Sequence, residues 1–150
     1  MSELLRAAAT AWNLLHDHPW LLAVAGAILL IVFVLRSPAG GACSSRDPRR
    51  TFTAAERAHA FQRAGMRCEH KSMFWVRCTN TATQGDHVFP WSQGGRTAMS
   101  NQQALCAFHN NRKSGAVPTR MYILRLQRRR RRYFPSGEQA RIEWRPGAAL

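Results

Sequence analysis

Segment 86–113 limits the possible fold and chemistry of this chain more than any other stretch, because it combines residue types that a hydrophobic core does not require. It opens with an acid beside a histidine, Asp86 and His87, and then turns through Pro90 and a Gly-Gly pair. It closes on a polar run that contains a cysteine, a histidine, asparagines and a lysine. Metal-assisted hydrolysis uses such a set: a carboxylate for a hard cation, an imidazole that takes a proton from water, and an amide that orients the imidazole.

Basic residues are concentrated in the part of the chain that contains this segment. The chain has 22 Lys and Arg against 8 Asp and Glu, for a net charge of +14. The first 40 residues hold two of each sign, so residues 41–150 carry the whole excess. Such an excess predicts a polyanionic partner, either nucleic acid or an anionic membrane surface. A basic surface that only favours solubility is the alternative.

Four cysteines can form two disulfides in a secreted protein or bind a metal in a reducing compartment. Cys106 and His109 have the chelating spacing Cys-x-x-His, and Cys68 and Cys78 lie upstream as a second pair. These four residues can fill a tetrahedral zinc site, and His70 is a weaker candidate ligand. The remaining cysteine, Cys43, stands alone in a Gly/Ser-rich stretch and is not assigned to the site.

The N-terminal part differs in composition from the rest. Residues 1–18 have helical periodicity and predict an amphipathic helix at a membrane surface, and residues 20–35 are sixteen uncharged apolar residues. A membrane-spanning helix needs about 20 residues, with roughly 17 as the lower limit, so the run is marginal in length. We favour a single membrane-spanning helix over a cleaved signal peptide or a buried core helix. The arginines that follow the run predict that the basic domain lies in the cytoplasm.

Residues 37–52 are rich in Pro, Gly and Ser and then become basic, which predicts a linker that is flexible at first. Its later arginines, Arg46, Arg49 and Arg50, are expected to attract lipid or nucleic acid phosphates.

Local patterns predict a small mixed α+β domain after the linker. Thr53 and Glu56 form a capping box, which predicts a helix that ends at Gly65. The expected elements are a helix over 53–64, strands at 74–76 and 86–89, a short strand or turn at 102–105, and a helix over about 106–114. With these elements the chain divides into 1–36, 37–52, 53–118 and 119–150.

Residues 120–134 predict a helix whose first part packs on the domain and whose second part is strongly basic. Five consecutive arginines form the second part: Arg128, Arg129, Arg130, Arg131 and Arg132. Each arginine that neutralises a phosphate would steepen the salt dependence of DNA binding by about 0.9 in log–log slope. A solvated charge run and a contact with lipid headgroups are the alternatives. Residues 135–150 are expected to be frayed.

Segment 53–115 resembles the HNH endonuclease family. The matching positions are Cys68, Cys78, Asp86-His87-Val88-x-Pro90, Gly94-Gly95, Asn101, Leu105-Cys106-x-x-His109-Asn110 and Lys113. The resemblance implies a zinc-stabilised ββα-metal fold, flanked here by helices and preceded by the membrane-spanning helix. It also implies cleavage of nucleic acid with a divalent cation, Mg²⁺ or Mn²⁺.

The resemblance assigns a role to each residue of the site. His87 matches the general base that deprotonates the attacking water, and a neutral imidazole near pH 7 suits that role. Asp86 matches the acid that binds the catalytic cation. Asn101 matches the asparagine that holds the strand–loop geometry and orients His87.

Two positions depart from the family pattern. His109 stands where the family has its second cysteine, so we expect it to bind the structural zinc with Cys68, Cys78 and Cys106. Asn110 stands where the last family histidine falls, and would become the second ligand of the catalytic cation through its amide oxygen. In the alternative, His109 binds the catalytic cation and the zinc site is incomplete.

These observations predict a membrane-tethered, metal-dependent HNH endonuclease that hydrolyses DNA. The expected nucleic acid contacts are Arg112, Lys113 and Arg128 to Arg132, although Arg112 and Lys113 could instead complement a helix C-terminus. The alternatives are a zinc-stabilised DNA-binding module without cleavage activity and a secreted nuclease.

Overall fold

The structure is a computed structural model that describes residues 2–39, 46–71, 76–145 and 148–149. The chain separates into two compact units, Met1–Ser37 and Pro38–Leu150. The predicted strand at 74–76 lies almost entirely outside the described residues.

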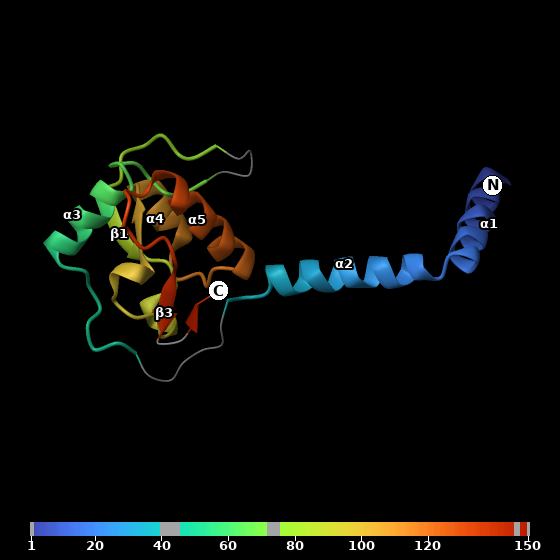
Figure 1. The fold of residues 1–150 in the computed structure, drawn as a ribbon, viewed down its shortest axis with the longest axis horizontal. Coiled ribbons are helices and arrows are strands. Elements are labelled where there is room, and N and C mark those ends of the chain that lie inside the picture. The colour runs from blue at the N-terminus through green and yellow to red at the C-terminus, as the bar shows by residue number, and fades with distance from the viewer. Residues whose placement is uncertain (1, 40–45, 72–75, 146–147, 150) are drawn as a thin grey trace. The chain divides into compact units, whose positions relative to one another are not determined.

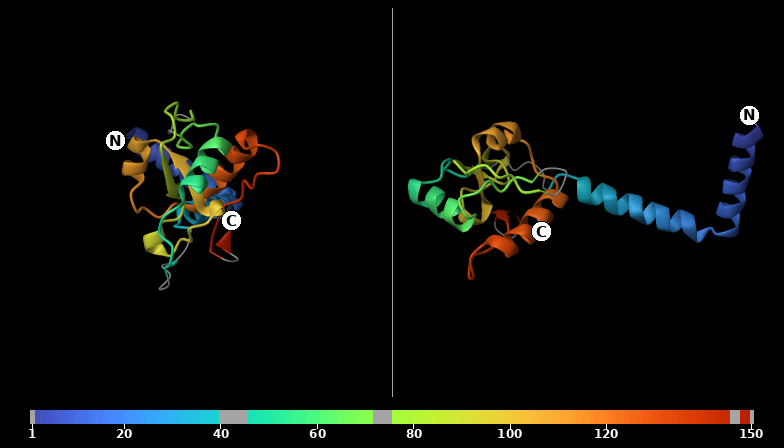
Figure 2. Two further views of the ribbon diagram at one scale, coloured as in Figure 1. Left: turned by 90° about the vertical axis from the view of Figure 1, so that its left-hand side faces the viewer. Right: turned by 90° about the horizontal axis from the view of Figure 1, so that it is seen from above.

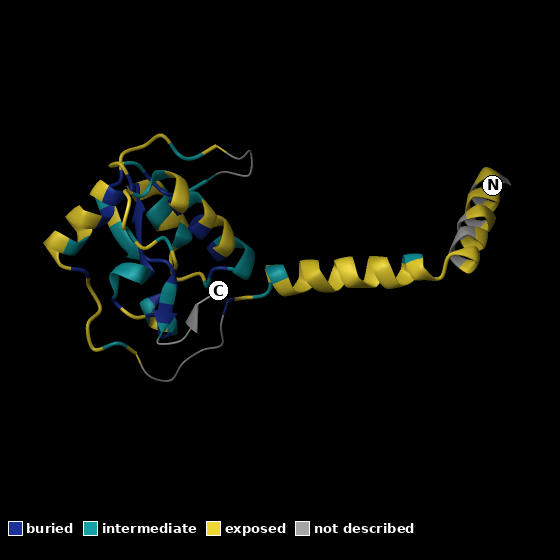
Figure 3. Ribbon diagram, in the orientation of Figure 1, coloured by how far each residue is buried: buried dark blue, intermediate teal, exposed yellow. Residues whose placement is uncertain are grey.

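The first unit consists of two helices, α1 (Ser2–Asp17) and α2 (Trp20–Arg36), which Pro19 separates. Helix α2 has no buried residue, and Figure 3 shows it exposed along its length. Its 17 residues at a rise of about 1.5 Å extend roughly 25 Å, less than the ~30 Å hydrocarbon core of a bilayer. Within the part of the chain that the structure describes, no helix is long and apolar enough to cross a membrane. The membrane-spanning helix expected at 20–35 is therefore not supported.

The second unit begins with the capped helix that the sequence predicts. Helix α3 (Ala54–Arg63) has a complete capping box: the Thr53 hydroxyl accepts from the Glu56 N–H, and the Glu56 carboxylate accepts from the Thr53 N–H. The chain leaves the helix through Gly65 and Met66, which have φ angles of 62° and 56°. This turn leads directly to Cys68.

A β-hairpin and a short helix form the centre of the second unit. Strand β1 (Gln84–His87) pairs antiparallel with β2 (Gln102–Leu105), with Asp86 opposite Gln103. Two 3-10 turns, η1 (Trp91–Gln93) and η2 (Met99–Asn101), lie in the connection between the strands. Helix α4 (Ala107–Lys113) follows β2 at once and packs near β1 (Figures 1 and 2). The order strand, strand, helix agrees with a ββα unit.

The C-terminal part packs against this unit. Helix α5 (Arg120–Tyr133) is followed by β3 (Glu143–Arg145), which pairs with β4 (Ala148–Ala149). Ile142 and Trp144 are buried in the main hydrophobic cluster, whose other members are Ala39, Val88, Phe89, Ile123 and Leu126. The Trp144 ring stacks on Phe89, with 5.5 Å between ring centroids. The expectation that residues 135–150 are frayed is therefore wrong for residues 142–145, which are packed against the domain.

Helix α5 does not present all five of its consecutive arginines to solvent. The Arg130 side chain is fully buried and its Nε lies 2.9 Å from the Glu69 carboxylate, which is also buried. Arg130 also donates to the Gln102 carbonyl, and the Tyr133 hydroxyl donates to Glu69. Arg130 is therefore a core residue that joins α5 to the hairpin, and its prediction as a nucleic acid contact is wrong.

Candidate functional site

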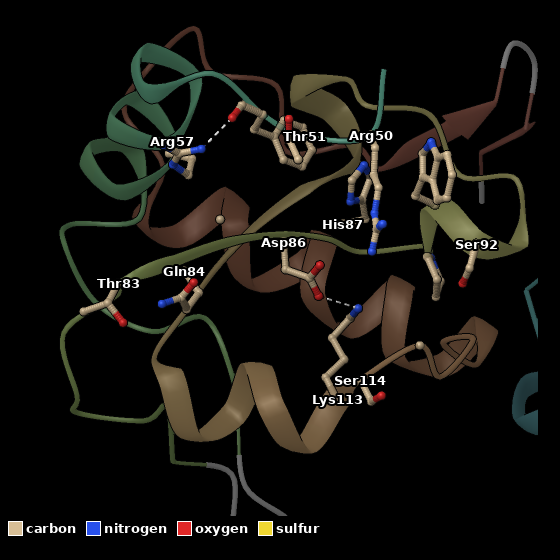
Figure 4. Close-up of a pocket in the computed structure, with 15 residues that line it drawn as sticks. Arg50, Thr51, Arg57, Thr83, Gln84, Asp86, His87, Ser92, Lys113 and Ser114 are labelled. Atoms are coloured by element: carbon tan, nitrogen blue, oxygen red, sulfur yellow. Dashed lines mark hydrogen bonds and ion pairs between the residues drawn. The ribbon is translucent and has the colours of Figure 1, made fainter. Parts of the chain in front are cut away.

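A cavity of about 580 Å³ lies beside β1, and both Asp86 and His87 line it. Figure 4 shows these two side chains together with the cations that share the cavity: Arg50, Arg57 and Lys113. Asp86 and His87 are adjacent in a strand, where successive side chains point to opposite faces. Both nevertheless reach the cavity, because β1 ends at His87 and the chain turns there.

The His87 ring is held on two sides. It is 7% exposed, and the Phe52 ring packs on it at 4.6 Å between centroids. Its Nε2 lies 2.9 Å from the Thr97 hydroxyl oxygen. Because the single Thr97 hydroxyl proton is donated to the Arg49 carbonyl, the Thr97 oxygen must accept from His87 Nε2–H. The neutral ring therefore carries its proton on Nε2, and Nδ1 is the nitrogen free to act as a base.

The electrostatic surroundings keep this imidazole neutral. Burial lowers the His87 pKa below its ordinary value of 6.5, against an opposing effect of the Asp86 carboxylate. The nearby Lys113 ammonium lowers it further. A neutral imidazole at pH 7 is the state that can accept a proton from water.

Asp86 makes an ion pair in the cavity. Lys113 Nζ, from the last residue of α4, lies 2.8 Å from Asp86 Oδ2. Both side chains are mostly covered, with 14% of Lys113 and 29% of Asp86 exposed. The lysine thus neutralises the carboxylate that the sequence assigns to a catalytic cation.

The donors that line the cavity fit a divalent cation in part. Mg²⁺ is usually held by one or two carboxylates together with waters and substrate phosphates, and Asp86 is the one carboxylate among the residues that line this cavity. Asn110, the predicted second ligand, is not among the lining residues. It lies one turn before Lys113 in α4, so it is on the same side of that helix.

Asn101 holds the loop that follows His87. Its amide oxygen accepts from the Phe89 N–H at 2.9 Å, and its amide nitrogen donates to the carbonyls of Phe89 and Arg96. It is fully buried. These contacts fix the loop that carries Thr97, whose hydroxyl is hydrogen-bonded to His87 Nε2. No motif in the sequence marks Thr97, because a single hydroxyl in a polar loop has no distinctive spacing.

The predicted zinc ligands come together at the other end of the hairpin. One ligand atom from each of Cys68, Cys78, Cys106 and His109 lies within 4.8 Å of the others. His109 Nδ1 is 3.3 Å from Cys106 Sγ and 3.6 Å from Cys68 Sγ. A tetrahedral zinc with bonds of about 2.3 Å to sulfur and about 2.0 Å to nitrogen holds those two atoms roughly 3.5 Å apart, so these spacings fit such an ion. This geometry favours His109 as a zinc ligand over the alternative in which it binds the catalytic cation.

The environment of the cluster also suits a metal. Burial raises the pKa of the Cys68 thiol to about 11, so a bound cation is needed to hold it as a thiolate at neutral pH. The Asn80 amide donates towards Cys106 Sγ. His70 stacks on the His109 ring at 3.8 Å between centroids, but it is not a member of the cluster.

The basic residues predicted to contact nucleic acid lie in different environments. Arg112 in α4 and Arg128, Arg131 and Arg132 in α5 are exposed. Arg129 is half-buried and donates to the Glu69 carbonyl. Arg50 and Arg57 line the cavity itself.

The hairpin, the following helix, the Cys3His cluster and the Asp–His pair together define a small metal-stabilised ββα domain of mixed α/β structure. Residues 67–115 match the family model described as HNH endonuclease. This match, which covers less than half of the chain, supports a function related to nucleic acid. Comparisons with curated proteins and with solved structures yield no match.

Proposed function

We propose that this protein is a metal-dependent endonuclease that hydrolyses DNA phosphodiester bonds. The main support for the proposal is the environment of the His87 imidazole. The ring is buried and neutral, is hydrogen-bonded at Nε2, and shares a cavity with Asp86. The HNH match over residues 67–115 supports the same reaction class.

In this proposal His87 Nδ1 takes the proton from the attacking water. Thr97 stabilises the imidazolium that forms, because its oxygen accepts from Nε2–H. A divalent cation at Asp86 would stabilise negative charge on the phosphate and on the leaving oxygen. The Asn110 amide oxygen is the proposed second ligand of that cation. Lys113, once released from Asp86, would donate to the phosphate.

DNA is the proposed substrate because residues 41–150 carry the whole net charge of +14. The cations at the cavity place part of that charge beside the Asp–His pair. The exposed arginines of α4 and α5 are the proposed contacts for neighbouring phosphates.

A second candidate is a zinc-stabilised DNA-binding module without cleavage activity. Two observations favour it: Lys113 occupies a carboxylate oxygen of Asp86, and Asn110 does not line the cavity. Such a module would bind DNA through the same basic residues and would leave the backbone intact.

Nicking of a supercoiled plasmid with added Mg²⁺ or Mn²⁺ separates the two candidates. We expect His87→Ala to abolish nicking while DNA binding persists. His59→Ala is a matched control, because His59 is a surface residue of α3 that pairs with Glu138 away from the cavity. Zinc content would be measured for each variant to establish folding. DNA binding by the wild-type protein without any nicking would support the module instead.

A further inference from the structure

The segment 46–52 lies outside the matched family region, and its last three residues, Arg50, Thr51 and Phe52, line the cavity of the candidate site. We call this segment the strap. We propose that the strap completes the site and that Arg50 binds a phosphate of the nucleic acid substrate; this inference rests on the proposed function.

Asp47 fastens the strap to the loop that follows His87. Its carboxylate accepts from the N–H groups of Arg49 and Thr97, at 2.9 Å and 3.2 Å. Its carbonyl accepts from the Trp91 indole N–H at 2.8 Å. The strap is therefore bonded to two separate points of the loop.

Arg49 makes a second set of contacts. Its guanidinium donates to both oxygens of Glu56 and to the Thr97 carbonyl. Its own carbonyl accepts the Thr97 hydroxyl proton. The strap is thus the last member of the hydrogen-bond chain that fixes the proton on His87 Nε2.

Phe52 brings the strap over the catalytic histidine. Its side chain is 4% exposed and packs on the His87 ring. Its carbonyl accepts from Arg57 Nη1 at 2.6 Å. The strap therefore covers one face of His87 and contributes to the burial that lowers the pKa of the ring.

Arg50 stands between these anchored residues, and its side chain lines the cavity with Asp86 and His87 (Figure 4). The other two lining cations already have partners, since Lys113 pairs with Asp86 and Arg57 donates to Phe52. Within the part of the chain that the structure describes, no carboxylate pairs with Arg50, which instead lies 5.4 Å from the Trp91 ring centroid. Its fork of N–H donors is therefore available.

A phosphate is the ligand that this arrangement fits best. A guanidinium presents parallel N–H donors that match two phosphate oxygens, and it stays charged at every relevant pH. A nucleic acid backbone supplies phosphates on both sides of the bond that is cut. Arg50 would hold one of them and so position the strand beside Asp86 and His87.

The chain supplies a matched control for Arg50. Arg46 also lies over the Trp91 ring, at 5.2 Å from its centroid, and is also exposed. It does not line the cavity. Arg46→Ala and Arg50→Ala therefore remove the same charge and the same kind of ring contact, and differ in the contact with the cavity.

The test uses the full chain and a labelled DNA duplex. Binding is measured over a series of salt concentrations without added Mg²⁺ or Mn²⁺, and nicking is measured with them. For Arg50→Ala we expect the log–log salt slope of binding to fall by about 0.9 and kcat/KM to fall tenfold or more because a charge-assisted phosphate contact is lost. Arg46→Ala should lower kcat/KM much less than Arg50→Ala does, because Arg46 does not line the cavity with Asp86 and His87. Arg50→Lys should restore the salt slope but only part of kcat/KM.

The outcomes separate this inference from the proposed function. Equal kcat/KM and equal salt slopes for Arg46→Ala and Arg50→Ala, in a wild-type protein that nicks DNA, would overturn the role of Arg50 and leave the nuclease intact. A wild-type protein that binds DNA without nicking it would overturn the nuclease, and the salt slopes alone would then decide whether Arg50 contacts a phosphate. A wild-type protein that does neither would overturn both.

Discussion

In the proposed mechanism the hydroxyl of Thr97 determines which nitrogen of His87 acts as the base, since it accepts from Nε2–H and donates to the Arg49 carbonyl. Thr97→Val keeps the shape of the side chain and removes both hydrogen bonds. We expect kcat for nicking to fall by roughly tenfold to a hundredfold with KM little changed, because the ring loses its orientation and tautomer. Thr97→Ser should recover most of kcat, since it restores the hydroxyl. A defect of the same size in both variants would argue that Thr97 acts only through packing.

The acid limb of the activity profile follows from the environment of His87. In the proposed mechanism the neutral ring is the base, so we expect activity above the His87 pKa and its loss as pH falls through that pKa. Because burial lowers this pKa below 6.5, the acid limb of kcat/KM should lie below pH 6.5. A cation at Asp86 would screen the carboxylate that opposes this effect, and would move the limb further down. Rates would be measured from about pH 5 to 8 with zinc content checked at each pH; a limb above 6.5 would contradict the assignment.

In the proposed mechanism Lys113 and a divalent cation would compete for the Asp86 carboxylate. Lys113→Met removes the ammonium that lies 2.8 Å from Asp86 Oδ2, so Mn²⁺ should bind several-fold to about tenfold more tightly. Asp86→Asn should lose this binding. The free Mn²⁺ signal in electron paramagnetic resonance measures both without reference to activity. Unchanged Mn²⁺ binding in Asp86→Asn would show that Asp86 is not the cation ligand, and unchanged binding in Lys113→Met would show that Lys113 does not compete with the cation.

At the scale of elements, the buried pair of Glu69 and Arg130 holds α5 to the hairpin. Burial alone would raise the Glu69 pKa, but the Arg130 charge and the hydrogen bonds from Arg130, Tyr133 and the Ala104 N–H outweigh it and hold the pKa below 4.5. The folded carboxylate therefore contributes stability above pH 4.5, and this contribution is lost as pH falls through the lower, folded pKa.

Removal of one partner of this pair should be costly. Arg130→Met would leave Glu69 buried without its ion-pair partner, which typically costs about 3–5 kcal/mol of unfolding free energy. Arg128→Met, on an exposed position of the same helix, should change the stability by less than about 0.5 kcal/mol. Denaturant unfolding at neutral pH measures both. Equal effects would mean that Arg130 is not a core residue in solution.

Helical periodicity alone could have separated Arg130 from its neighbours. The buried residues of α5 are Ile123, Leu126, Gln127 and Arg130, which have the i, i+3, i+4, i+7 spacing of one helix face. The run of five arginines predicts a charged surface, although its third member, Arg130, falls on the apolar face of α5. The capping box and the order strand, strand, helix could be predicted because they depend on residues that are close together in the sequence.

The strap and the C-terminal strand could not be predicted in the same way. Arg49 meets Thr97 across 48 positions of sequence, and Trp144 packs on Phe89 from the far end of the chain. The Pro, Gly and Arg content of segment 37–52 predicts a linker. The composition of a segment does not indicate which distant residues the segment contacts. The candidate site could therefore be predicted only in part: Asp86 and His87 belong to a motif, whereas Thr97, Arg50 and Phe52 do not.

At the scale of the whole molecule, the Cys3His cluster joins three parts of the chain that share few apolar contacts. It ties the turn after α3, the loop at Cys78 and the start of α4. Among the residues that the structure describes, the buried members of its local apolar cluster are Cys68, Cys106 and Leu105. A metal that replaces core in this way contributes directly to folding free energy. We expect one zinc per chain, and we expect its removal to unfold the second unit and abolish DNA binding and nicking together.

Two neighbouring histidines provide a matched test of that zinc site. His109→Ala removes a ligand and should lower zinc content and the melting temperature sharply, because the remaining three ligands leave the ion open to exchange. His70→Ala removes the ring that stacks on His109 but no ligand, so its zinc content should stay at one per chain. Substitution with Co²⁺ would report the ligand set through its thiolate absorption bands. Full zinc content and an unchanged melting temperature in His109→Ala would contradict the site, since the hairpin and α4 would then be held together by packing alone.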